Sequence, residues 1–288
     1  MQIFHIISIG RIYVRFGKNL KHFLRSDLAP ALEPSNSKCI TGKGSHFHLN
    51  THLSTLPQDG SVKIMGIDEA GRGAVLGNLV IAGLSFKKED EAQLIKIGVK
   101  DSKKLTAKKR EALFPEIMNL CKECKIIEVE PQEIDDSVFD IKSNLNLLEI
   151  NKICEIINAI QPSIVYIDAL TSDAKKFADT LKQYLVQRHI TLIAENNADE
   201  IYPIVSAASI VAKVTRDNSL NSLKQEFNLP HIGSGYPSDP KTIEALKQWI
   251  KNRNIPFFVR KSWHTFVKMR DLQKNAKITQ FFDVRGER

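Results

Sequence analysis

The chain has 288 residues, of which 42% are hydrophobic and 26% charged, and this composition is typical of a soluble globular protein with a sizeable core. Its formal net charge of +8 favours a polyanionic partner, although merely basic proteins are also common. Four cysteines in a chain of this length exclude a disulfide framework, and no run approaches the roughly 18 apolar residues of a membrane span.

Residues 1–61 differ in composition from the rest of the chain. Up to Arg25 the sequence contains five Lys or Arg residues and no acid, interleaved with apolar residues, as in an organelle transit peptide. It could equally be translated upstream sequence that never packs. Residues 34–61 are rich in Ser, Gly, Thr, His and Pro, which suits a linker. We therefore expect residues 1–61 to form a loosely ordered N-terminal extension.

From residue 62 onward, apolar runs alternate with amphipathic stretches. This alternation is typical of an α/β domain whose functional sites lie at the ends of its strands. Thr106 is a predicted N-cap, Pro162 marks the end of a helix and Pro203 the start of another. The predicted strands are residues 62–67, 78–86, 125–129, 163–168 and 190–194, and the predicted helices are residues 106–121, 145–160, 174–188, a helix from 203, and 241–251.

The first predicted strand ends in two adjacent acids, Asp68 and Glu69, and a Gly71-Arg72-Gly73 turn follows. Acids at the end of a buried strand are costly unless they are compensated, and a divalent metal ion could compensate them. The alternative is a solvated acid pair at the start of a loop. Adjacent residues of a regular strand point to opposite faces, so we predict that the strand ends or bulges at Asp68, with Glu69 already in the turn.

Two further segments carry acids at corresponding points. Asp168 ends the strand at 163–168, and Asp199 lies just ahead of the helix that starts at Pro203, where it could also be an ordinary N-cap. Four carboxylates that face one pocket would repel one another unless divalent cations bind between them. Two such ions about 4 Å apart are the arrangement that hydrolyses phosphodiesters by in-line attack. The acids therefore predict metal-dependent cleavage of a nucleic acid.

Basic and aromatic residues accompany these acids. Lys213 and Arg216 share one helix face with Ser209 and could present two cations to a backbone phosphate, or they could be solvated surface residues. Lys103 lies in an Asp-Ser-Lys loop. Tyr236 lies on a glycine-rich loop, where it could stack on a sugar or base or simply cover the edge of the core.

Six motifs in family order resemble those of a type 2 ribonuclease H, in the form seen in archaea, over residues 62–267. The motifs are Gly66-Ile-Asp-Glu-Ala-Gly-Arg-Gly73, Asp101-Ser-Lys-Lys-Leu105, Tyr166-Ile-Asp168, Ala198-Asp199, Ser206-Ala-Ala-Ser-Ile-Val-Ala-Lys-Val-Thr-Arg-Asp217 and Gly233-Ser-Gly-Tyr-Pro237. The resemblance implies a ribonuclease H-like mixed sheet flanked by helices, with a helical C-terminal extension. It implies a catalytic domain at residues 62–227 and a substrate-contacting loop with C-terminal helices at residues 228–270.

The resemblance also implies roles for individual residues. The metal-binding catalytic carboxylates would be Asp68, Glu69, Asp168 and Asp199, with Mg²⁺ or Mn²⁺ as cofactor. The backbone of Gly71, Arg72 and Gly73 would approach the 2′-hydroxyl of a ribonucleotide, which distinguishes RNA from DNA. Tyr236 would pack on the sugar at an RNA–DNA junction. Positions near backbone phosphates would be those of Lys103, Lys213 and Arg216.

The implied activity is that of an endoribonuclease. It would hydrolyse the RNA strand of RNA–DNA hybrids and cut 5′ to ribonucleotides embedded in duplex DNA, leaving a 3′-hydroxyl and a 5′-phosphate. One alternative is a non-catalytic hybrid-binding module that recruits a sliding clamp, although such a module has no need of four carboxylates. A type 3 ribonuclease H is another, but its preceding substrate-binding domain needs strand-rich alternation that residues 1–60 lack, and the Gly-Arg-Gly turn favours type 2.

The tail at residues 271–288 contains Ile278, Phe281 and Phe282, in an arrangement that resembles a sliding-clamp-binding motif of replication and repair enzymes. Asn275 stands where that motif usually has glutamine. Exposed phenylalanines need a partner surface, and packing on the protein's own core is the alternative. We expect a cytoplasmic monomer that has no membrane partner.

Overall fold

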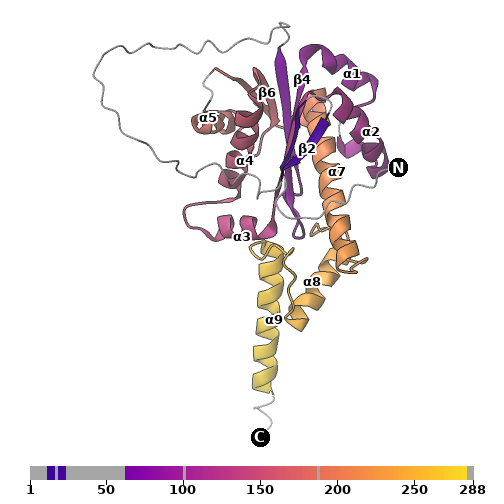
Figure 1. Ribbon diagram of the computed structural model, residues 1–288. Coiled ribbons are helices and arrows are strands. Elements are labelled where there is room, and N and C mark those ends of the chain that lie inside the picture. The colour runs from indigo at the N-terminus through magenta and orange to yellow at the C-terminus, as the bar shows by residue number, and fades with distance from the viewer. Residues whose placement is uncertain (1–11, 17–18, 24–61, 100–101, 187–188, 284–288) are drawn as a thin grey trace, which may run out of the picture.

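The structure is a computed structural model that describes the backbone of residues 12–16, 19–23, 62–99, 102–186 and 189–283, with side chains described between residues 62 and 274. Its centre is a mixed sheet with the strand order β2-β1-β5-β4-β3-β6-β7 (Figure 1). β3 pairs antiparallel with β4 and parallel with β6, and β6 pairs parallel with β7. The strands are β1 (Ile12–Phe16), β2 (Asn19–Phe23), β3 (Lys63–Ala70), β4 (Leu79–Lys87), β5 (Glu123–Val129), β6 (Ile164–Asp168) and β7 (Thr191–Glu195).

Helices cover both faces of this sheet and enclose separate apolar cores (Figure 1). α4 and α5 pack on one face, where Met65 and Ile67 of β3 meet Ile153 of α4. α1, α2 and α7 pack on the other face, which contains Ile64 and Phe86. The predicted mixed sheet flanked by helices is confirmed. The helices are α1 (Glu91–Lys96), α2 (Ala107–Leu120), α3 (Pro131–Phe139), α4 (Leu145–Ile160), α5 (Ala174–Tyr184), α6 (Ala198–Ile201), α7 (Pro203–Glu226), α8 (Pro240–Asn252) and α9 (His264–Asp283), with short 3-10 helices η2 (Lys88–Asp90) and η3 (Ser102–Lys104).

α7 packs closely along β3. The carbonyl oxygen of Ile204 would lie 2.1 Å from a Cβ on Gly66, so only glycine fits at this crossing. Ala207, Ala208 and Ser209 of the helix are fully buried there. The small residues of α7 thus allow its backbone to pack closely against β3. They also bring the polar face of the helix over the end of β3.

β3 is regular up to Ala70, so the predicted break at Asp68 is wrong. Asp68, Glu69 and Ala70 each pair with a residue of β4, and the last pair joins Ala70 to Val80. This antiparallel partner keeps the strand extended until the Gly71 turn begins. Because side chains alternate along a strand, Asp68 and Glu69 leave β3 on opposite faces of the sheet.

The N-terminal extension contains regular structure that the sequence did not predict. β1 and β2 form an antiparallel hairpin, and β1 pairs with β5 at the edge of the sheet. Basic residues mixed among apolar ones hide the strand pattern in Ile-Tyr-Val-Arg-Phe and Asn-Leu-Lys-His-Phe. The rest of residues 1–61 lies outside the described residues. The division into extension, catalytic domain, C-terminal helices and tail stays a prediction.

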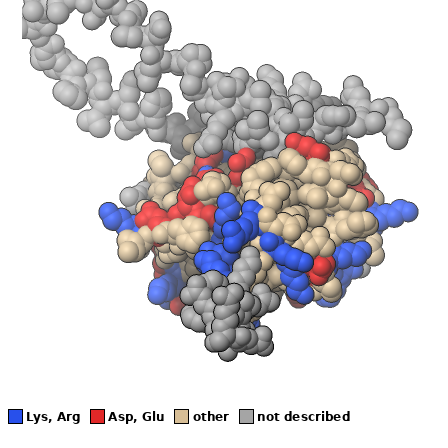
Figure 2. Space-filling model, turned by 90° about the horizontal axis from the view of Figure 1, so that it is seen from below, with Lys and Arg blue, Asp and Glu red and all other residues tan. Residues whose placement is uncertain are grey.

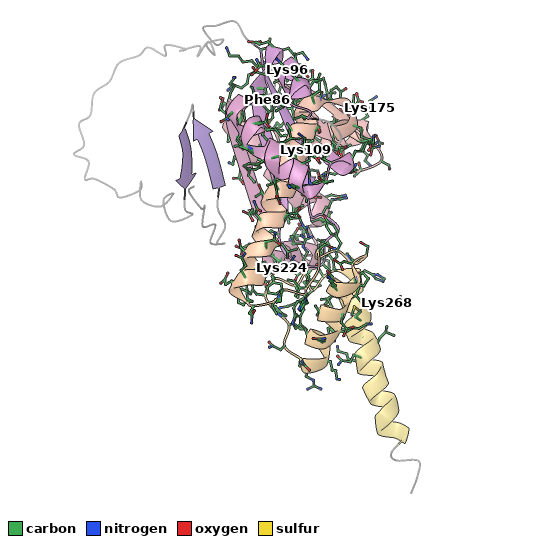
Figure 3. The ribbon with its side chains drawn as sticks, turned by 90° about the vertical axis from the view of Figure 1, so that its right-hand side faces the viewer. Phe86, Lys96, Lys109, Lys175, Lys224 and Lys268 are labelled. Carbon is green, nitrogen blue, oxygen red and sulfur yellow. The ribbon has the colours of Figure 1, made fainter. Side chains whose placement is uncertain are left out.

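α8 and α9 form the predicted helical C-terminal extension, which has its own apolar core around Leu246, Phe258 and Phe266. A β-bridge between Leu76 and Val259 joins this extension to the segment that follows β3. Figure 3 shows the extension set apart from the sheet core that contains Phe86. Among the helices that the structure describes, none is both long and apolar enough to cross a membrane.

Candidate active site

The parallel strands bring three of the predicted acids to one edge of the sheet. Ile67 of β3 pairs with Ile167 of β6, so Asp68 and Asp168 follow on neighbouring strands. Asp168 in turn pairs with Glu195 at the end of β7, and Asp199 lies in the first turn of α6 just beyond. Parallel strands place their carboxyl ends together, which is the usual position of functional sites in α/β proteins.

Asp68 and Asp168 are held by backbone amides. The Oδ1 atom of Asp68 accepts a hydrogen bond from the amide of Glu69 at 2.7 Å, and the Oδ1 atom of Asp168 accepts one from the amide of Ala198 at 3.0 Å. Burial raises the pKa of Asp68 from 3.8 to about 6, against the opposing effect of the Lys213 ammonium. Burial and the nearby Asp199 also raise the pKa of Asp168. Ionisation of either carboxylate therefore lowers the stability of the folded protein in the absence of a cation.

Asp199 is the acid with the least complete set of partners. It is only 2% exposed, and its Oδ1 atom has no hydrogen-bond partner within the described residues. The Nζ atom of Lys103 forms an ion pair with Oδ1 at 3.5 Å, and the hydroxyl of Ser102 donates a long hydrogen bond to Oδ2, also at 3.5 Å. Burial opposes the shift, but the charges of Asp199 and Asp168 raise the pKa of Lys103, whose ammonium lies beside Asp199. A buried carboxylate oxygen without a hydrogen bond is suited to a cation.

Glu69 lies on the face of α4, where its surroundings differ from those of Asp68. Burial raises its pKa well above 4.5, and the charges of Asp68, Glu149 and Asp168 raise it further, while Arg72 lowers it. Glu69 is therefore within electrostatic reach of the other acids, although it leaves the strand on the opposite face. Its assignment as a metal ligand stays a prediction.

The donor set fits a hard divalent cation, because it consists of carboxylate oxygens, which Mg²⁺ and Mn²⁺ prefer. Burial and mutual repulsion raise the pKa of Asp68, Glu69 and Asp168, and the Oδ1 atom of Asp199 has an ion pair with Lys103 at 3.5 Å but no hydrogen bond within the described residues. Within the described residues, no group of three or more His, Cys, Asp or Glu side chains is already arranged to hold one ion. Asp68, Asp168 and Asp199 are the residues that would hold such an ion.

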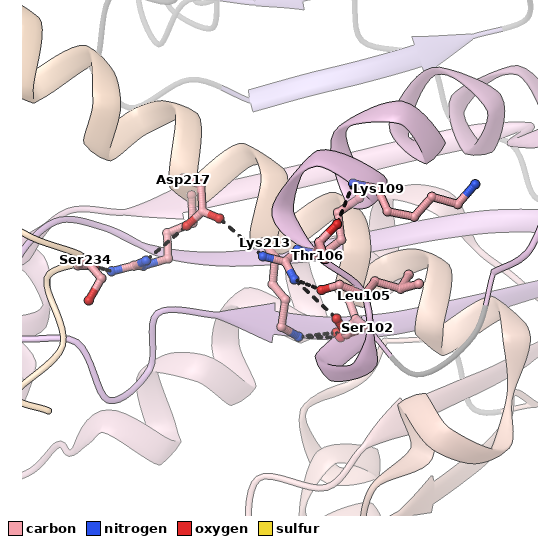
Figure 4. Close-up of polar contacts among 10 residues, drawn as sticks. Ser102, Leu105, Thr106, Lys109, Lys213, Asp217 and Ser234 are labelled. Carbon is pink, nitrogen blue, oxygen red and sulfur yellow. Dashed lines mark hydrogen bonds and ion pairs between the residues drawn. The ribbon is translucent and has the colours of Figure 1, made fainter. Parts of the chain in front are cut away.

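Lys213 lies beside the acids and is tied to two hydroxyl groups (Figure 4). Its Nζ atom donates to the hydroxyl oxygen of Ser102 at 2.8 Å and to that of Ser209 at 2.5 Å. The two hydroxyls also bond one another at 2.8 Å. This network joins η3 to α7 and places a cation near Asp68, which lowers the pKa of that acid. The position is compatible with the predicted phosphate contact.

Arg216 has surroundings that differ from the predicted solvent-facing phosphate contact. It is only 4% exposed and donates from Nη2 to the carbonyl of Ser234 at 2.7 Å, a contact that Figure 4 draws. It also stacks on the Tyr236 ring, with 4.5 Å between its guanidinium carbon and the ring centroid. Arg216 thus joins α7 to the tyrosine loop, and its guanidinium packs against the ring of the predicted recognition tyrosine.

The two glycines of the Gly71-Arg72-Gly73 turn differ in their surroundings. Gly71 has a φ of +85°, and a Cβ there would lie 2.7 Å from the Nε atom of Arg216, so the fold itself requires glycine. A Cβ on Gly73 would meet nothing within 4 Å, and Gly73 is exposed. The fold therefore leaves open space beside Gly73, where a ligand could approach the backbone.

The partly exposed Arg72 side chain reaches toward α4, which sequence reasoning did not foresee. Its Nε atom donates to both carboxylate oxygens of Glu149, at 2.9 and 3.1 Å, and its Nη2 atom donates to the side chain of Asn146. Glu149 is fully buried, at 0% exposure. A usable signal was present, because Glu149 interrupts the apolar face of α4 between Leu148 and Ile153. A charged residue on a buried helix face implies a partner.

The predicted clamp-binding residues of the tail lie toward the end of α9. α9 carries the backbone of Ile278, Phe281 and Phe282, but their side chains lie outside the described residues, as does Asp101 of the Asp-Ser-Lys motif.

Comparison with known proteins identifies the family. The family model of Ribonuclease HII matches residues 65–266. A ribonuclease HII of Methanococcus maripaludis strain C6 is 40% identical over 238 residues, which are 81% of this chain and 98% of the relative. A ribonuclease HII of Pyrococcus abyssi is 40% identical over 221 residues, which are 76% and 96% of the two chains.

Solved structures agree with this result. The ribonuclease H2 of Pyrococcus horikoshii OT3 has a TM-score of 0.66 and 41% identity, covering 73% of this chain and 98% of that chain. The ribonuclease HII in a PCNA complex from Archaeoglobus fulgidus has a TM-score of 0.65 and 40% identity, covering 72% and 96%. Ribonuclease HIII in complex with Mn²⁺, at 21% identity, shares the fold alone. The predicted resemblance to type 2 is confirmed, and the chain belongs to the ribonuclease HII family of endoribonucleases.

Proposed function

We propose that this protein hydrolyses the RNA strand of RNA–DNA hybrids and cuts 5′ to ribonucleotides embedded in duplex DNA, leaving a 3′-hydroxyl and a 5′-phosphate. The observation that carries the proposal is the placement of Asp68, Asp168 and Asp199 at adjoining strand ends, beside a turn whose Gly73 backbone faces open space. Reaction and recognition groups are thereby only a few residues apart. Such an activity would serve the removal of ribonucleotides during DNA replication and repair.

The proposed cofactor is Mg²⁺ or Mn²⁺, held by Asp68, Asp168 and Asp199 with Glu69 from the opposite face. When bound, divalent ions supply an activated water and stabilise the leaving oxygen of a phosphodiester. Backbone amides already hold Asp68 and Asp168 in place, so these carboxylates are pre-oriented for a cation. Use of divalent metals by ribonuclease H enzymes supports this assignment.

Substrate binding would use charges around the acids and on the C-terminal extension. Lys103 and Lys213 lie next to the carboxylates and would contact the phosphates that flank the cut. Apart from the buried Arg260, residues 240–274 contain eight Lys or Arg and two acids, and Figure 2 shows Lys and Arg side chains gathered on the lower face of the molecule. Phosphate contacts of this kind supply most of the affinity for a nucleic acid and make it salt-dependent. Tyr236 would stack on the sugar at the RNA–DNA junction, with the Arg216 guanidinium packed against its ring.

The test is cleavage of a continuous RNA–DNA hybrid by the full chain, with Mg²⁺ or with EDTA, and by an Asp199→Asn variant. We expect cleavage by the wild-type protein with Mg²⁺, none with EDTA, and a loss of at least about 1,000-fold in kcat for Asp199→Asn, because one buried carboxylate ligand is removed. Asp179→Asn, which changes an exposed acid on α5, is the matched control and should retain full activity. Full activity of Asp199→Asn would overturn the site assignment.

We also propose that the tail contacts a sliding clamp through Ile278, Phe281 and Phe282. The support is the motif itself, together with the Archaeoglobus fulgidus relative whose structure was solved as a PCNA complex. The measurement is calorimetric titration of the full chain with an archaeal PCNA. Replacing Phe281 and Phe282 by Ala should abolish binding without changing cleavage, whereas unchanged binding would exclude the tail as the contact.

A further inference from the structure

Arg260 is the largest fully buried side chain of the described residues, at 0% exposure. A buried cation is costly unless it is paired, yet no carboxylate of the described residues lies within ion-pair distance of this guanidinium. Its hydrogen bonds go instead to two backbone carbonyls, from Nε to Gly77 at 3.0 Å and from Nη1 to Arg72 at 3.1 Å. The Trp263 ring lies against it, with 4.8 Å between the guanidinium carbon and the ring centroid.

The segment around Arg260 runs alongside the chain that leaves the Gly71-Arg72-Gly73 turn. The amide of Arg260 donates to the carbonyl of Val75 at 2.9 Å, and the amide of Gly77 donates to the carbonyl of Phe258 at 2.9 Å. On its other side the same chain is bonded to the tyrosine loop, where the amide of Val75 donates to the carbonyl of Gly235 at 2.8 Å. The turn, the tyrosine loop and the C-terminal extension therefore meet along residues 75–77.

The bond to the Arg72 carbonyl has a consequence for the next amide. Arg72 C=O and Gly73 N–H belong to one planar trans peptide, so they point in opposite directions. Because Arg260 holds the carbonyl toward the interior, the Gly73 N–H points outward. Within the described residues this N–H has no hydrogen-bond partner, and the space beside Gly73 is open.

We propose that Arg260 is a positioning residue that fixes the Arg72–Gly73 peptide so that the Gly73 N–H faces the 2′-hydroxyl of a bound ribonucleotide. The ribonucleotide substrate in this inference rests on the proposed function, whereas the orientation of the Arg72–Gly73 peptide does not depend on it. An apolar side chain of the same volume would leave the carbonyls of Gly77 and Arg72 without this donor, so arginine ties the turn to the C-terminal extension by hydrogen bonds and not by packing alone. Arg216 complements it, because its guanidinium packs under Gly71 and Tyr236 on the neighbouring side of the turn.

The variants that test this proposal are Arg260→Met, which keeps the length of the side chain without its donors, and Arg260→Lys, which can reach one carbonyl. Leu94→Ala is the matched control, because Leu94 is fully buried in α1 near the opposite end of β3. It loses core packing without touching the turn. Circular dichroism and thermal melting of all proteins establish that each is folded at the assay temperature.

The first measurement is the amide resonance of Gly73 in protein labelled with ¹⁵N-glycine, assigned by its disappearance in Gly73→Ala. We expect this resonance to shift and its amide exchange rate to change in Arg260→Met, and less so in Arg260→Lys, while Gly83 of β4 is unaffected. Leu94→Ala should leave Gly73 unchanged. An unaltered Gly73 resonance in Arg260→Met would overturn the proposal, and if that variant does not fold, the same criterion applies to Arg260→Lys.

The second measurement is the kinetics of cleavage of a DNA duplex that contains one ribonucleotide. We expect Arg260→Met to lower kcat roughly 100-fold, the size of effect that a misplacement of about 1 Å can cause, with KM changed less than about 3-fold because Arg260 contacts no phosphate. Arg260→Lys should recover part of the loss. Loss in KM alone, or equal losses in Leu94→Ala, would contradict the inference. If the wild-type protein cleaves no ribonucleotide-containing duplex, the proposed function fails, while the Gly73 resonance still decides the role of Arg260.

Discussion

Replacing Asp68 by Asn should make the metal-free protein more stable while it abolishes cleavage. Burial raises the pKa of Asp68 from 3.8 to about 6. Each pKa unit corresponds to about 1.4 kcal/mol, so an ionised Asp68 lowers the free energy of unfolding by about 3 kcal/mol at pH 8. The change Asp68→Asn removes the charge and keeps an oxygen that can accept the bond from the Glu69 amide.

The sign of the pH dependence follows from the same pKa. The carboxyl binds its proton more tightly in the folded protein than in the unfolded chain, so the free energy of unfolding falls as the pH rises from about 4 to about 6. We therefore expect Asp68→Asn to be more stable than the wild type by about 2–3 kcal/mol at pH 8 in EDTA. This advantage should shrink below about 1 kcal/mol at pH 4.

Urea unfolding followed by circular dichroism at both pH values measures this difference. Asp179→Asn controls for the loss of one negative charge at the surface, and its stability should stay within about 0.5 kcal/mol of the wild type. Added Mg²⁺ should stabilise the wild type and not Asp68→Asn, since a ligand stabilises only the state that binds it. Equal or lower stability of Asp68→Asn at pH 8 in EDTA would refute the reasoning.

Two further predictions concern the turn. Gly71→Ala should destabilise the protein by about 1–3 kcal/mol, because it forces a Cβ into a positive-φ position against Arg216. Gly73→Ala should change the free energy of unfolding by less than about 0.5 kcal/mol but reduce cleavage of a single-ribonucleotide duplex. Urea unfolding and cleavage kinetics on the same samples measure both effects, and equal losses of stability in the two variants would contradict the prediction. Arg72→Met should lower the free energy of unfolding by about 3 kcal/mol, because it leaves the buried Glu149 carboxylate without its ion-pair partner. Glu149→Gln should lower it by only about 1 kcal/mol, because the Arg72 guanidinium that loses its partner is partly exposed. The reverse order in urea unfolding would show that the pair is not held as described.

The sequence predicted the strand ends better than the side-chain directions. Asp68, Asp168 and Asp199 could be placed together because apolar runs mark the strands and parallel strands align their carboxyl ends. The break at Asp68 was predicted wrongly, since nothing local to Glu69 shows that β4 pairs as far as Ala70. Local pattern cannot reveal where a ladder ends, because that depends on the partner strand.

The arginines illustrate the same limit at longer range. Helical spacing correctly put Lys213 and Arg216 on one face of α7, but whether that face meets solvent depends on the tyrosine loop, which covers Arg216. Arg260 lies in a basic stretch and resembles its exposed neighbours in sequence. Its role depends on a contact with Arg72, 188 residues away in the chain, and such contacts are absent from any local pattern.

The central claim is that acids at the strand ends cut a nucleic acid where the adjacent turn detects a ribose. Its most direct test is to map the cut made by the wild-type protein in a DNA duplex with one ribonucleotide, beside the same duplex with deoxyribose at that position. We predict one Mg²⁺-dependent cut immediately 5′ to the ribonucleotide, with a 3′-hydroxyl and a 5′-phosphate, and no cut in the all-DNA duplex. Cleavage of both duplexes, cleavage that persists in EDTA, or a cut that leaves a 2′,3′-cyclic phosphate would contradict the account.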